Sequence, residues 1–345
     1  MLITTYKVTA PNVIEEFVED ISVSKGQALV KVDTLAICKA DIRYFLGLRS
    51  KAVLDHKYPL TPIHEAVGYI VKDYTGCFKK GDKVILVPNY VDKSKCVDCI
   101  HERCKEEALG ENYCPYATFL SSTKDGFLKP FFAGNEKNLV KIDDSIPMNI
   151  AVWSELLSVG LAGCRRLGIK PHQKLAIFGD GIMAYLVYLV LIYMYEADVT
   201  VYGIDEDKMK CFKKAKTTTF SRGNKLYFDT LIECVGGKYA PDAINNMIDI
   251  ATIGADLLLM GVTEDLAGIN TRKVLEKGLC IKGVTRSSYN DFVKVSKLLE
   301  NKELQSDLKD IVLSETTINN ISDIYHTYEK EISNTKVIGK NLLRF

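Results

Sequence analysis

The sequence carries almost no net charge, and this excludes some classes of partner. Its 345 residues include 45 Lys and Arg against 44 Asp and Glu, which leaves a formal net charge of +1 at pH 7. A protein that works mainly on nucleic acid or on an anionic membrane surface usually carries a clear excess of positive charge. We therefore expect neither nucleic acid nor a membrane among its partners.

The sequence also lacks long apolar runs, export signals, internal repeats and low-complexity segments. Its longest apolar run, residues 182–195, falls short of the roughly 20 residues that cross a bilayer. Residues 1–4 begin no secretory signal, because neither a charged segment nor a cleavage site accompanies an apolar core. Ten Cys without an export signal favour reduced thiols and metal binding over disulfides. The cytoplasm is the expected location.

The composition is that of a globular protein, and the predicted secondary structure changes part-way along the chain. The sequence is 47% hydrophobic and long enough for two domains. Up to about residue 141 it predicts short strands and loops, and from residue 149 it predicts helices alternating with strands. The strands expected in this second part are 175–178, 199–202, 217–220, 230–235, 256–260 and 280–284. Such a succession indicates a parallel, doubly wound sheet.

These patterns predict an α/β protein of two domains. A β-rich domain is expected over residues 1–148, and a Rossmann domain over residues 149–286. Residues 287–345, with a helix over 289–301 and a last strand near 337–343, are expected to return and complete the first domain.

A glycine turn lies at the centre of the second part. After the strand at 175–178 comes Gly-Asp-Gly-Ile-Met-Ala at 179–184, which leads into the apolar helix. In a dinucleotide site, Gly179 would make the tight turn and Gly181 would let the backbone approach the pyrophosphate. The pyrophosphate would lie at the helix N-terminus, over Ile182 and Met183. A structural turn between strand and helix, without a ligand, is the alternative interpretation.

Metal-binding residue types lie in and just after the β-rich part. Cys38, the pair His64 and Glu65, and Glu155 supply thiolate, imidazole and carboxylate, the ligand types that zinc accepts. A catalytic zinc site uses three protein ligands and leaves one position for water or substrate. Taken singly, a buried Cys or His is more often a core residue than a ligand.

A second group of cysteines has the spacing C-x2-C-x4-C-x9-C. It consists of Cys96, Cys99, Cys104 and Cys114, in a polar stretch without strand patterns. Four thiolates would form a closed tetrahedral zinc site that stabilises a segment with no core of its own. Reduced thiols without a metal are the alternative interpretation.

The sequence resembles the zinc-dependent medium-chain dehydrogenase/reductase family over essentially its whole length. The family's C-G-S-D, G-H-E and E-P-L-S-V-G blocks are similar to residues 38–41, 63–65 and 155–160, in the same order. The resemblance implies a GroES-like catalytic domain in which Cys38 and His64 bind zinc. Glu65 or Glu155 would be the third ligand, the other holding the zinc-bound water. It also implies that Asp41 orients His64.

The resemblance extends to the cofactor. Lys39 stands where the family often has a basic residue that touches the cofactor pyrophosphate. NAD enzymes usually place an acid at the end of the second strand, whereas a 2′-phosphate needs that acid absent and a cation nearby. Here the position aligns with Gly203, and Lys208 follows, which favours NADPH. Asp205 would weaken this prediction if the register slipped by two residues.

Longer matches resemble the ribulose-5-phosphate reductases, which make ribitol 5-phosphate for CDP-ribitol and so for teichoic acid or capsule polymers. They cover residues 40–49, 233–237, 243–249 and 270–279. The resemblance implies zinc-assisted reduction of a sugar phosphate by NADPH. Arg43, Arg49 and Arg286 are candidates for the phosphate, because a guanidinium pairs with phosphate through two hydrogen bonds. Each could equally be a surface charge.

Several points stay open at this stage. The family's proton-relay hydroxyl is replaced by Ala40, so Ser154, Tyr44 or a water held by Glu155 would take its role. The family implies a homodimer or homotetramer, and the product implies a ribitol-5-phosphate cytidylyltransferase as a possible associate. Two alternatives are a zinc polyol dehydrogenase acting on sorbitol or xylitol with NAD, and a noncatalytic NADPH-binding protein.

Overall fold

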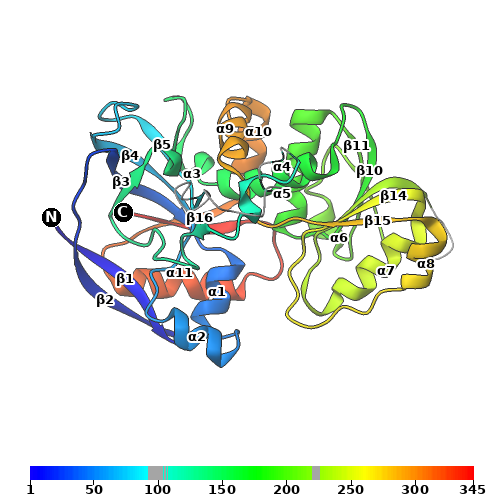
Figure 1. Ribbon diagram of the computed structural model, residues 1–345, viewed down its shortest axis with the longest axis horizontal. Coiled ribbons are helices and arrows are strands. Elements are labelled where there is room, and N and C mark those ends of the chain that lie inside the picture. Colours follow the sequence, from blue (N-terminus) through cyan, green and yellow to red (C-terminus); the bar gives the residue numbers. More distant parts are fainter. Residues whose placement is uncertain (92–103, 105, 107, 220–225) are drawn as a thin grey trace.

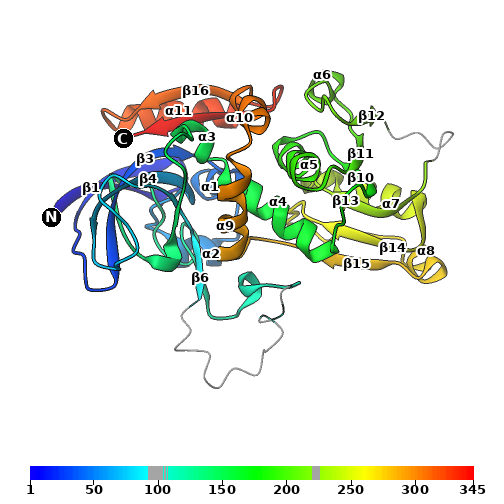
Figure 2. The same ribbon diagram turned by 90° about the horizontal axis from the view of Figure 1, so that it is seen from above.

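Two sheets organise the protein in the computed structural model, which describes residues 1–91, 104, 106, 108–219 and 226–345. One part of the molecule is built on a parallel sheet and the other on a mainly antiparallel sheet, and the two lie side by side in Figures 1 and 2. Helices α4 (Ser154–Leu167), α5 (Ile182–Tyr195) and α9 (Tyr289–Leu298) lie towards the middle, where α4 packs against both others.

The parallel sheet has the strand order β12-β11-β10-β13-β14-β15. Its strands are β10 (Lys174–Phe178), β11 (Asp198–Tyr202), β12 (Lys216–Thr218), β13 (Phe228–Glu233), β14 (Ala251–Leu259) and β15 (Cys280–Gly283). The chain moves outward from β10 to β12 and then crosses back to β13, so the strand order reverses between β10 and β13. This reversal creates the crevice in which doubly wound sheets bind dinucleotides. The predicted parallel, doubly wound sheet is confirmed.

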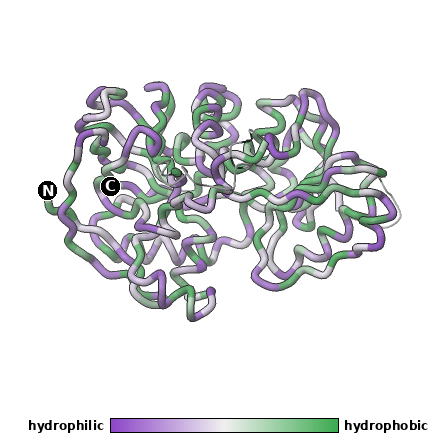
Figure 3. The backbone as a smooth tube through the Cα atoms, in the orientation of Figure 1, coloured by the Kyte–Doolittle hydropathy of each residue, from purple (hydrophilic) through white to green (hydrophobic). Residues whose placement is uncertain are grey.

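The predicted apolar helix is α5, and it is buried along most of its length. Every residue from Ala184 to Leu191 is buried, and strands of the parallel sheet also appear hydrophobic in Figure 3. A helix that is apolar on all sides belongs inside a protein or a membrane. Around the sheet lie α6 (Glu206–Met209), α7 (Ala240–Ile250) and α8 (Thr271–Lys277). Within the described residues no helix is both long and apolar enough to span a bilayer.

The second sheet gathers strands from both ends of the chain. Its order is β16-β17-β3-β4-β5-β9, with β8 also paired to β3. The strands are β3 (Gln27–Ala36), β4 (Glu65–Asp73), β5 (Lys83–Leu86), β8 (Phe131–Asn135), β9 (Leu139–Lys141), β16 (Val312–Thr317) and β17 (Lys340–Arg344). The last strand, β17, is antiparallel to β3, with Leu343 opposite Leu35 in the buried core. The C-terminal segment therefore returns to the N-terminal sheet.

Smaller elements surround this sheet. Two antiparallel pairs join β1 (Leu2–Ala10) to β2 (Val13–Asp20), and β6 (Asn89–Val91) to β7 (Ala117–Phe119). The helices are α1 (Lys39–Phe45), α2 (Lys51–Lys57), α3 (Met148–Ala151), α10 (Lys302–Lys309) and α11 (Ile321–Ser333). Short 3₁₀ helices span Glu111–Tyr113, Glu136–Asn138 and Gly237–Tyr239.

Helices α1 and α2 lie in a region for which the sequence predicts strands and loops. Both have only 7 residues, which is too short for a convincing helical period in the sequence. Capping and packing stabilise α1, whereas α2 has no buried residue and no side-chain hydrogen bond at its N-cap. In α1 the Asp41 carboxylate accepts a hydrogen bond from the backbone N–H of Cys38, while Ile42 and Phe45 are buried.

Candidate active site

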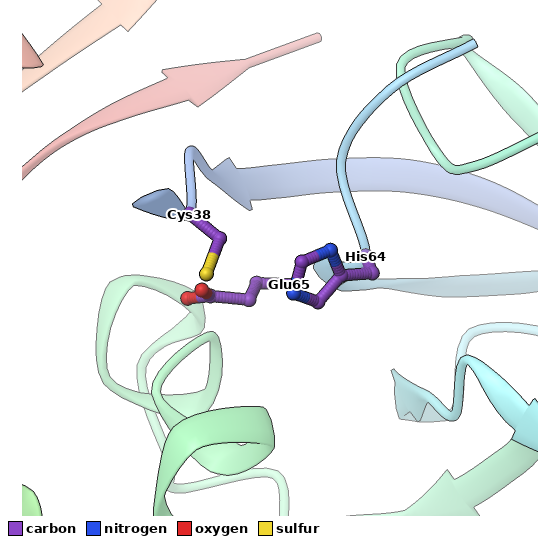
Figure 4. Close-up of side chains that lie close together, drawn as sticks. All are labelled: Cys38, His64 and Glu65. Atoms are coloured by element: carbon purple, nitrogen blue, oxygen red, sulfur yellow. The ribbon is translucent and has the colours of Figure 1, made fainter. Parts of the chain in front are cut away.

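Cys38, His64 and Glu65 come together at one end of the antiparallel sheet. Cys38 follows β3, and the other two residues stand at the start of β4. Because β3 and β4 are antiparallel neighbours, with Ala36 opposite Glu65, the end of one strand lies beside the start of the other. One ligand atom from each of the three side chains lies within 4.8 Å of the others (Figure 4).

Two neighbouring side chains contact the same ring nitrogen of His64. Its Nδ1 lies 2.8 Å from Oγ of Ser121 and 3.5 Å from a carboxylate oxygen of Asp41. These contacts leave Nε2 as the nitrogen available to a metal. Burial tends to lower the pKa of His64, but the neighbouring Asp41 carboxylate and Cys38 raise it well above its ordinary value. Ser121 was not among the residues that the sequence singled out.

Asp41 ties the two ligand segments together. Its carboxylate accepts hydrogen bonds from the backbone N–H groups of Cys38 and Ile63, each at 3.0 Å. Burial works to raise the pKa of Asp41, but the charge of His64 and these hydrogen bonds lower it below its usual value. An ionised Asp41 therefore positions the backbone on both sides of the metal-ligand cluster.

Glu65 is paired with a buried lysine that sequence analysis did not nominate. Both carboxylate oxygens of Glu65 lie 2.6 Å from Nζ of Lys340, which belongs to β17. Burial tends to lower the pKa of Lys340, but the Glu65 carboxylate raises it above its ordinary value. Lys340 thus offsets part of the negative charge that a thiolate and a carboxylate bring to the site.

Glu155, the other candidate carboxylate, lies in the first turn of α4. It is buried and lies outside the compact group of three, yet it interacts electrostatically with the same cluster. Burial raises the pKa of Glu155 to about 7; His64 and Lys340 oppose this effect, and Glu65 adds to it. A carboxyl group with such a pKa can take or release a proton near neutrality.

This set of donors fits zinc. Thiolate is a soft ligand, imidazole a borderline one and carboxylate a hard one, and together they match catalytic zinc sites. Three ligand atoms within 4.8 Å of one another leave space for one ion between them. Lys340 is an ammonium group and cannot bind a cation, but it reduces the repulsion between the anionic ligands.

The glycine turn after β10 has the geometry of a phosphate cradle. Gly179 adopts a φ of 127°, and a Cβ there would lie 3.1 Å from backbone atoms of Cys234. Gly181 precedes α5, and a Cβ there would meet nothing within 4 Å. No side chain caps the N-terminus of α5, at Ile182 and Met183, so its first N–H groups are available to an anion.

At the end of β11, Gly203 is the position that the sequence analysis assigned to the ribose-binding acid of NAD enzymes. The carboxylate of Asp205 accepts hydrogen bonds from the backbone N–H groups of Asp207 and Lys208, at the start of α6. Nζ of Lys208 lies 3.9 Å from Asp205 and donates to the carbonyl of Thr335 at 2.7 Å. Asp180, from the glycine turn, accepts hydrogen bonds from the backbone N–H groups of residues 204 and 205. Asp180 and Asp205 thus place two carboxylates at the end of β11, and contact of Lys208 with a 2′-phosphate stays a prediction.

Lys39 lies at the start of α1. Its Nζ donates to the backbone carbonyl of Glu331, in α11, at 3.3 Å. This contact joins the metal-ligand segment to the returning C-terminal segment. Contact of Lys39 with a cofactor stays a prediction.

Arg286 is linked to the metal-ligand cluster through the Phe119 ring. Its guanidinium stacks on Phe119 with 4.7 Å to the ring centroid, and the Phe119 ring lies 5.2 Å from the His64 ring. Arg286 adopts a positive φ of 59°, which is unusual for a residue with a side chain. Burial lowers the pKa of Arg286 below its ordinary value, against the influence of Tyr44.

Arg43 and Tyr44 lie in α1, the helix that follows Cys38, and Arg49 lies shortly after it. The Tyr44 hydroxyl lies 3.5 Å from Oγ of Ser122, and the Arg49 guanidinium lies 5.5 Å from the centre of the Tyr44 ring. Both arginines contact Glu264, on the loop that follows β14.

The second cysteine group is only partly described. Cys104 is half-buried and Cys114 is buried, whereas Cys96 and Cys99 lie outside the described residues. The structural zinc site therefore stays a prediction.

Comparison with known proteins identifies the family. Residues 24–144 match the alcohol dehydrogenase GroES-like domain. Ribulose-5-phosphate reductase 1 of Staphylococcus aureus (strain NCTC 8325 / PS 47) is 33% identical, over 100% of this chain and 99% of that relative. The chain belongs to the ribulose-5-phosphate reductase family. Ribulose-5-phosphate reductase of Streptococcus pneumoniae (strain ATCC BAA-255 / R6), another member, is 32% identical over 96% of this chain and 95% of its own.

Solved structures place the family within the zinc-type dehydrogenase fold. The crystal structure of S. aureus TarJ in complex with NADPH has a TM-score of 0.83 and 30% identity, and the match covers 100% of this chain and 99% of TarJ. L-idonate 5-dehydrogenase of Escherichia coli, at 16% identity and a TM-score of 0.86, shares the fold. The predicted GroES-like and Rossmann architecture, and the resemblance to these reductases, are confirmed.

Proposed function

We propose that this protein reduces ribulose 5-phosphate to ribitol 5-phosphate, with NADPH as the reductant and zinc in the active site. The observation that carries the proposal is the convergence of Cys38, His64 and Glu65 within 4.8 Å. It occurs in a chain that is 33% identical over its whole length to a ribulose-5-phosphate reductase. Loss of catalysis would leave no reason to keep such a cluster of ligands.

Cys38 and Nε2 of His64 hold the zinc in this proposal, with Glu65 or Glu155 as the third ligand. When bound, zinc supplies a Lewis acid for the carbonyl oxygen, and NADPH supplies the hydride. Asp41 and Ser121 keep the ligand segment and the imidazole in orientation. The ammonium group of Lys340 forms an ion pair with Glu65, and this ion pair weakens the binding of that carboxylate to the metal.

Reduction of a ketone requires a proton as well as a hydride. With Glu65 as the third zinc ligand, Glu155 would be free to carry it, and burial raises the pKa of its carboxyl to about 7. The Tyr44 hydroxyl, next to Ser122, and the buried Ser154 are the other candidates. In our proposal the Glu155 carboxyl delivers its proton through a water molecule.

NADPH would lie across the carboxyl ends of β10 and β11. Gly179 and Gly181, with the N–H groups of Ile182 and Met183, would receive the pyrophosphate. The ammonium of Lys208 would bind the 2′-phosphate, with Gly203 in place of the acid that NAD enzymes carry there. The complex of the related TarJ with NADPH supports this choice of cofactor.

The sugar phosphate would be recognised by arginines. Arg286 lies against the ring beside His64, while Arg43 and Arg49 lie on α1 and the residues after it. A guanidinium offers a planar pair of donors that matches two phosphate oxygens.

We also propose a division of the chain into two domains. Residues 1–148 and 287–345 would form the catalytic domain, and residues 149–286 the NADP-binding domain. We also propose a homodimer or homotetramer in the cytoplasm, where reduced thiols persist. A ribitol-5-phosphate cytidylyltransferase, which would consume the product, is the proposed associate.

Steady-state kinetics with two sugars and two cofactors test the proposal. We expect kcat/KM for ribulose 5-phosphate with NADPH to exceed that for ribulose by about a hundredfold or more, because the arginines lose their anionic partner. Equal rates with both sugars would reject a phosphate-recognising enzyme. Faster oxidation of sorbitol or xylitol with NAD would instead identify a polyol dehydrogenase. NADPH binding without turnover of any of these would favour a noncatalytic protein.

A further inference from the structure

We infer that Arg43 and Arg49 form an anion subsite that the protein itself occupies with Glu264, and that the substrate phosphate must displace this carboxylate. The inference rests on the proposed function, because it assigns these two arginines to the phosphate of the sugar. It adds a resident competitor, Glu264, and thus a residue that sets affinity and specificity for phosphorylated substrates.

The two guanidinium groups converge on a single carboxylate oxygen. Oε1 of Glu264 lies 2.5 Å from an Nη1 of Arg49 and 3.6 Å from Nη1 of Arg43. Two cations directed at one oxygen define a position for an anion, and in this structure a side chain fills it. The position therefore does not depend on any bound ion.

The contact joins the two parts of the molecule. Arg43 belongs to α1, which lies on the side of the β-rich part that faces the parallel sheet in Figure 1. Glu264 lies between β14 and α8 of the parallel-sheet part, 215 residues from Arg49. The ion pair thus spans the boundary at which cofactor and substrate are proposed to meet.

The arginines are more firmly held than the glutamate. Their side chains are 27% and 22% exposed, against 53% for Glu264. The guanidinium of Arg49 also stacks on the Tyr44 ring. An exposed side chain on a loop is easier to displace than two half-buried guanidinium groups, so Glu264 is the removable member.

The Glu264 carboxylate balances the charge and fills the hydrogen bonds of the two arginines only in part. Two guanidinium groups face one carboxylate, which leaves a net positive charge for a second negative charge to balance. Nε of Arg49 is buried and has no hydrogen-bond partner within the part of the chain that the structure describes. A phosphate dianion brings a second charge and three acceptor oxygens, so it can satisfy both arginines better than Glu264 does.

Calorimetric titration of the zinc-loaded protein with inorganic phosphate tests this exchange. We expect Glu264→Gln to tighten phosphate binding by about three- to tenfold, because the resident anion is gone while the arginines remain. The matched control is Asp265→Asn, which removes a charge from the next position on the same loop and should leave the affinity unchanged. Adding Arg49→Met to Glu264→Gln should abolish the gain.

Unchanged or weaker phosphate binding by Glu264→Gln would overturn the inference. Persistence of the gain after Arg49→Met would do so too, since the phosphate would then bind elsewhere. The titration needs no turnover, so it stays informative even if ribulose 5-phosphate is not the substrate.

A kinetic comparison separates competition from loop opening. In Glu264→Gln the KM for ribulose 5-phosphate should fall by a similar factor, while the slow rate with ribulose stays the same. An equal gain with ribulose, which has no phosphate, would mean that the variant acts by loosening the loop, and this result would contradict the inference.

Discussion

At the metal-ligand cluster, the ion pair between Glu65 and Lys340 has two opposing effects on metal binding. Glu65 is buried, and so is Lys340, whose ammonium group lies 2.6 Å from both carboxylate oxygens. A buried charge is costly unless a partner offsets it. The same carboxylate is a candidate zinc ligand. Lys340 therefore stabilises the site before the metal arrives and limits how strongly Glu65 can bind it afterwards.

Replacing this lysine should destabilise the metal-free protein. We expect Lys340→Met to lower the free energy of unfolding by about 3–5 kcal/mol, because it leaves the Glu65 carboxylate buried without a counter-ion. Urea unfolding followed by circular dichroism measures the change. The double variant with Glu65→Gln should lose less than the sum of the single losses. Strict additivity would show that the pair is not coupled.

Zinc content is the direct measure of the proposed ligands. Cys38→Ser should lose about one equivalent of zinc per chain, because a thiolate ligand of a three-ligand site is replaced by a poor one. Elemental analysis after dialysis gives the stoichiometry. Cys77→Ser is the matched control, since Cys77 is exposed and stands apart from the cluster of three. Identical zinc content in both variants would remove Cys38 from the site.

At the scale of elements, α4 and α9 connect the two parts of the chain. Asp291, in α9, accepts hydrogen bonds from Nε and Nη2 of Arg165, in α4, at 3.0 and 2.9 Å. The same carboxylate accepts from the backbone N–H and hydroxyl of Ser288 at 2.8 Å, which caps α9. One buried carboxylate thus fixes both the start of α9 and its contact with the helix that carries Glu155.

Removing this charge should destabilise the protein more than removing a surface charge. We expect Asp291→Asn to lower the free energy of unfolding by about 2–4 kcal/mol, because it weakens a buried, two-pronged ion pair and a helix cap. Asp310→Asn breaks an exposed pair with Lys213 and should cost less than about 1 kcal/mol. Chemical denaturation of both variants compares them, and equal losses would contradict a special role for Asp291.

At the scale of the whole molecule, the candidate site draws on distant segments. The ligands come from the ends of β3 and β4, their counter-ion from β17, and a further carboxylate from α4. The anion subsite adds a loop from the parallel-sheet part. Activity therefore requires that the C-terminal segment return to the N-terminal sheet and that both sheets meet.

Much of this architecture could be predicted from local patterns in the sequence. Short apolar runs separated by helices predicted the parallel sheet, and the glycine turn after residue 178 predicted where its nucleotide-binding end lies. The short helices α1 and α2 were missed, because a helix of two turns leaves little periodicity in the sequence.

The sequence by itself determined the succession of strands and helices along the chain. It also determined the segments that carry Cys38, His64 and Glu155. Both depend on neighbours within a few residues. Only the tertiary structure decided that Lys340 pairs with Glu65, 275 residues away, and that Glu264 contacts Arg49. Charged side chains far apart in sequence have no periodic signature. Their pairing arises from which strands and loops the fold brings together, and from the cost of burying a charge without a partner.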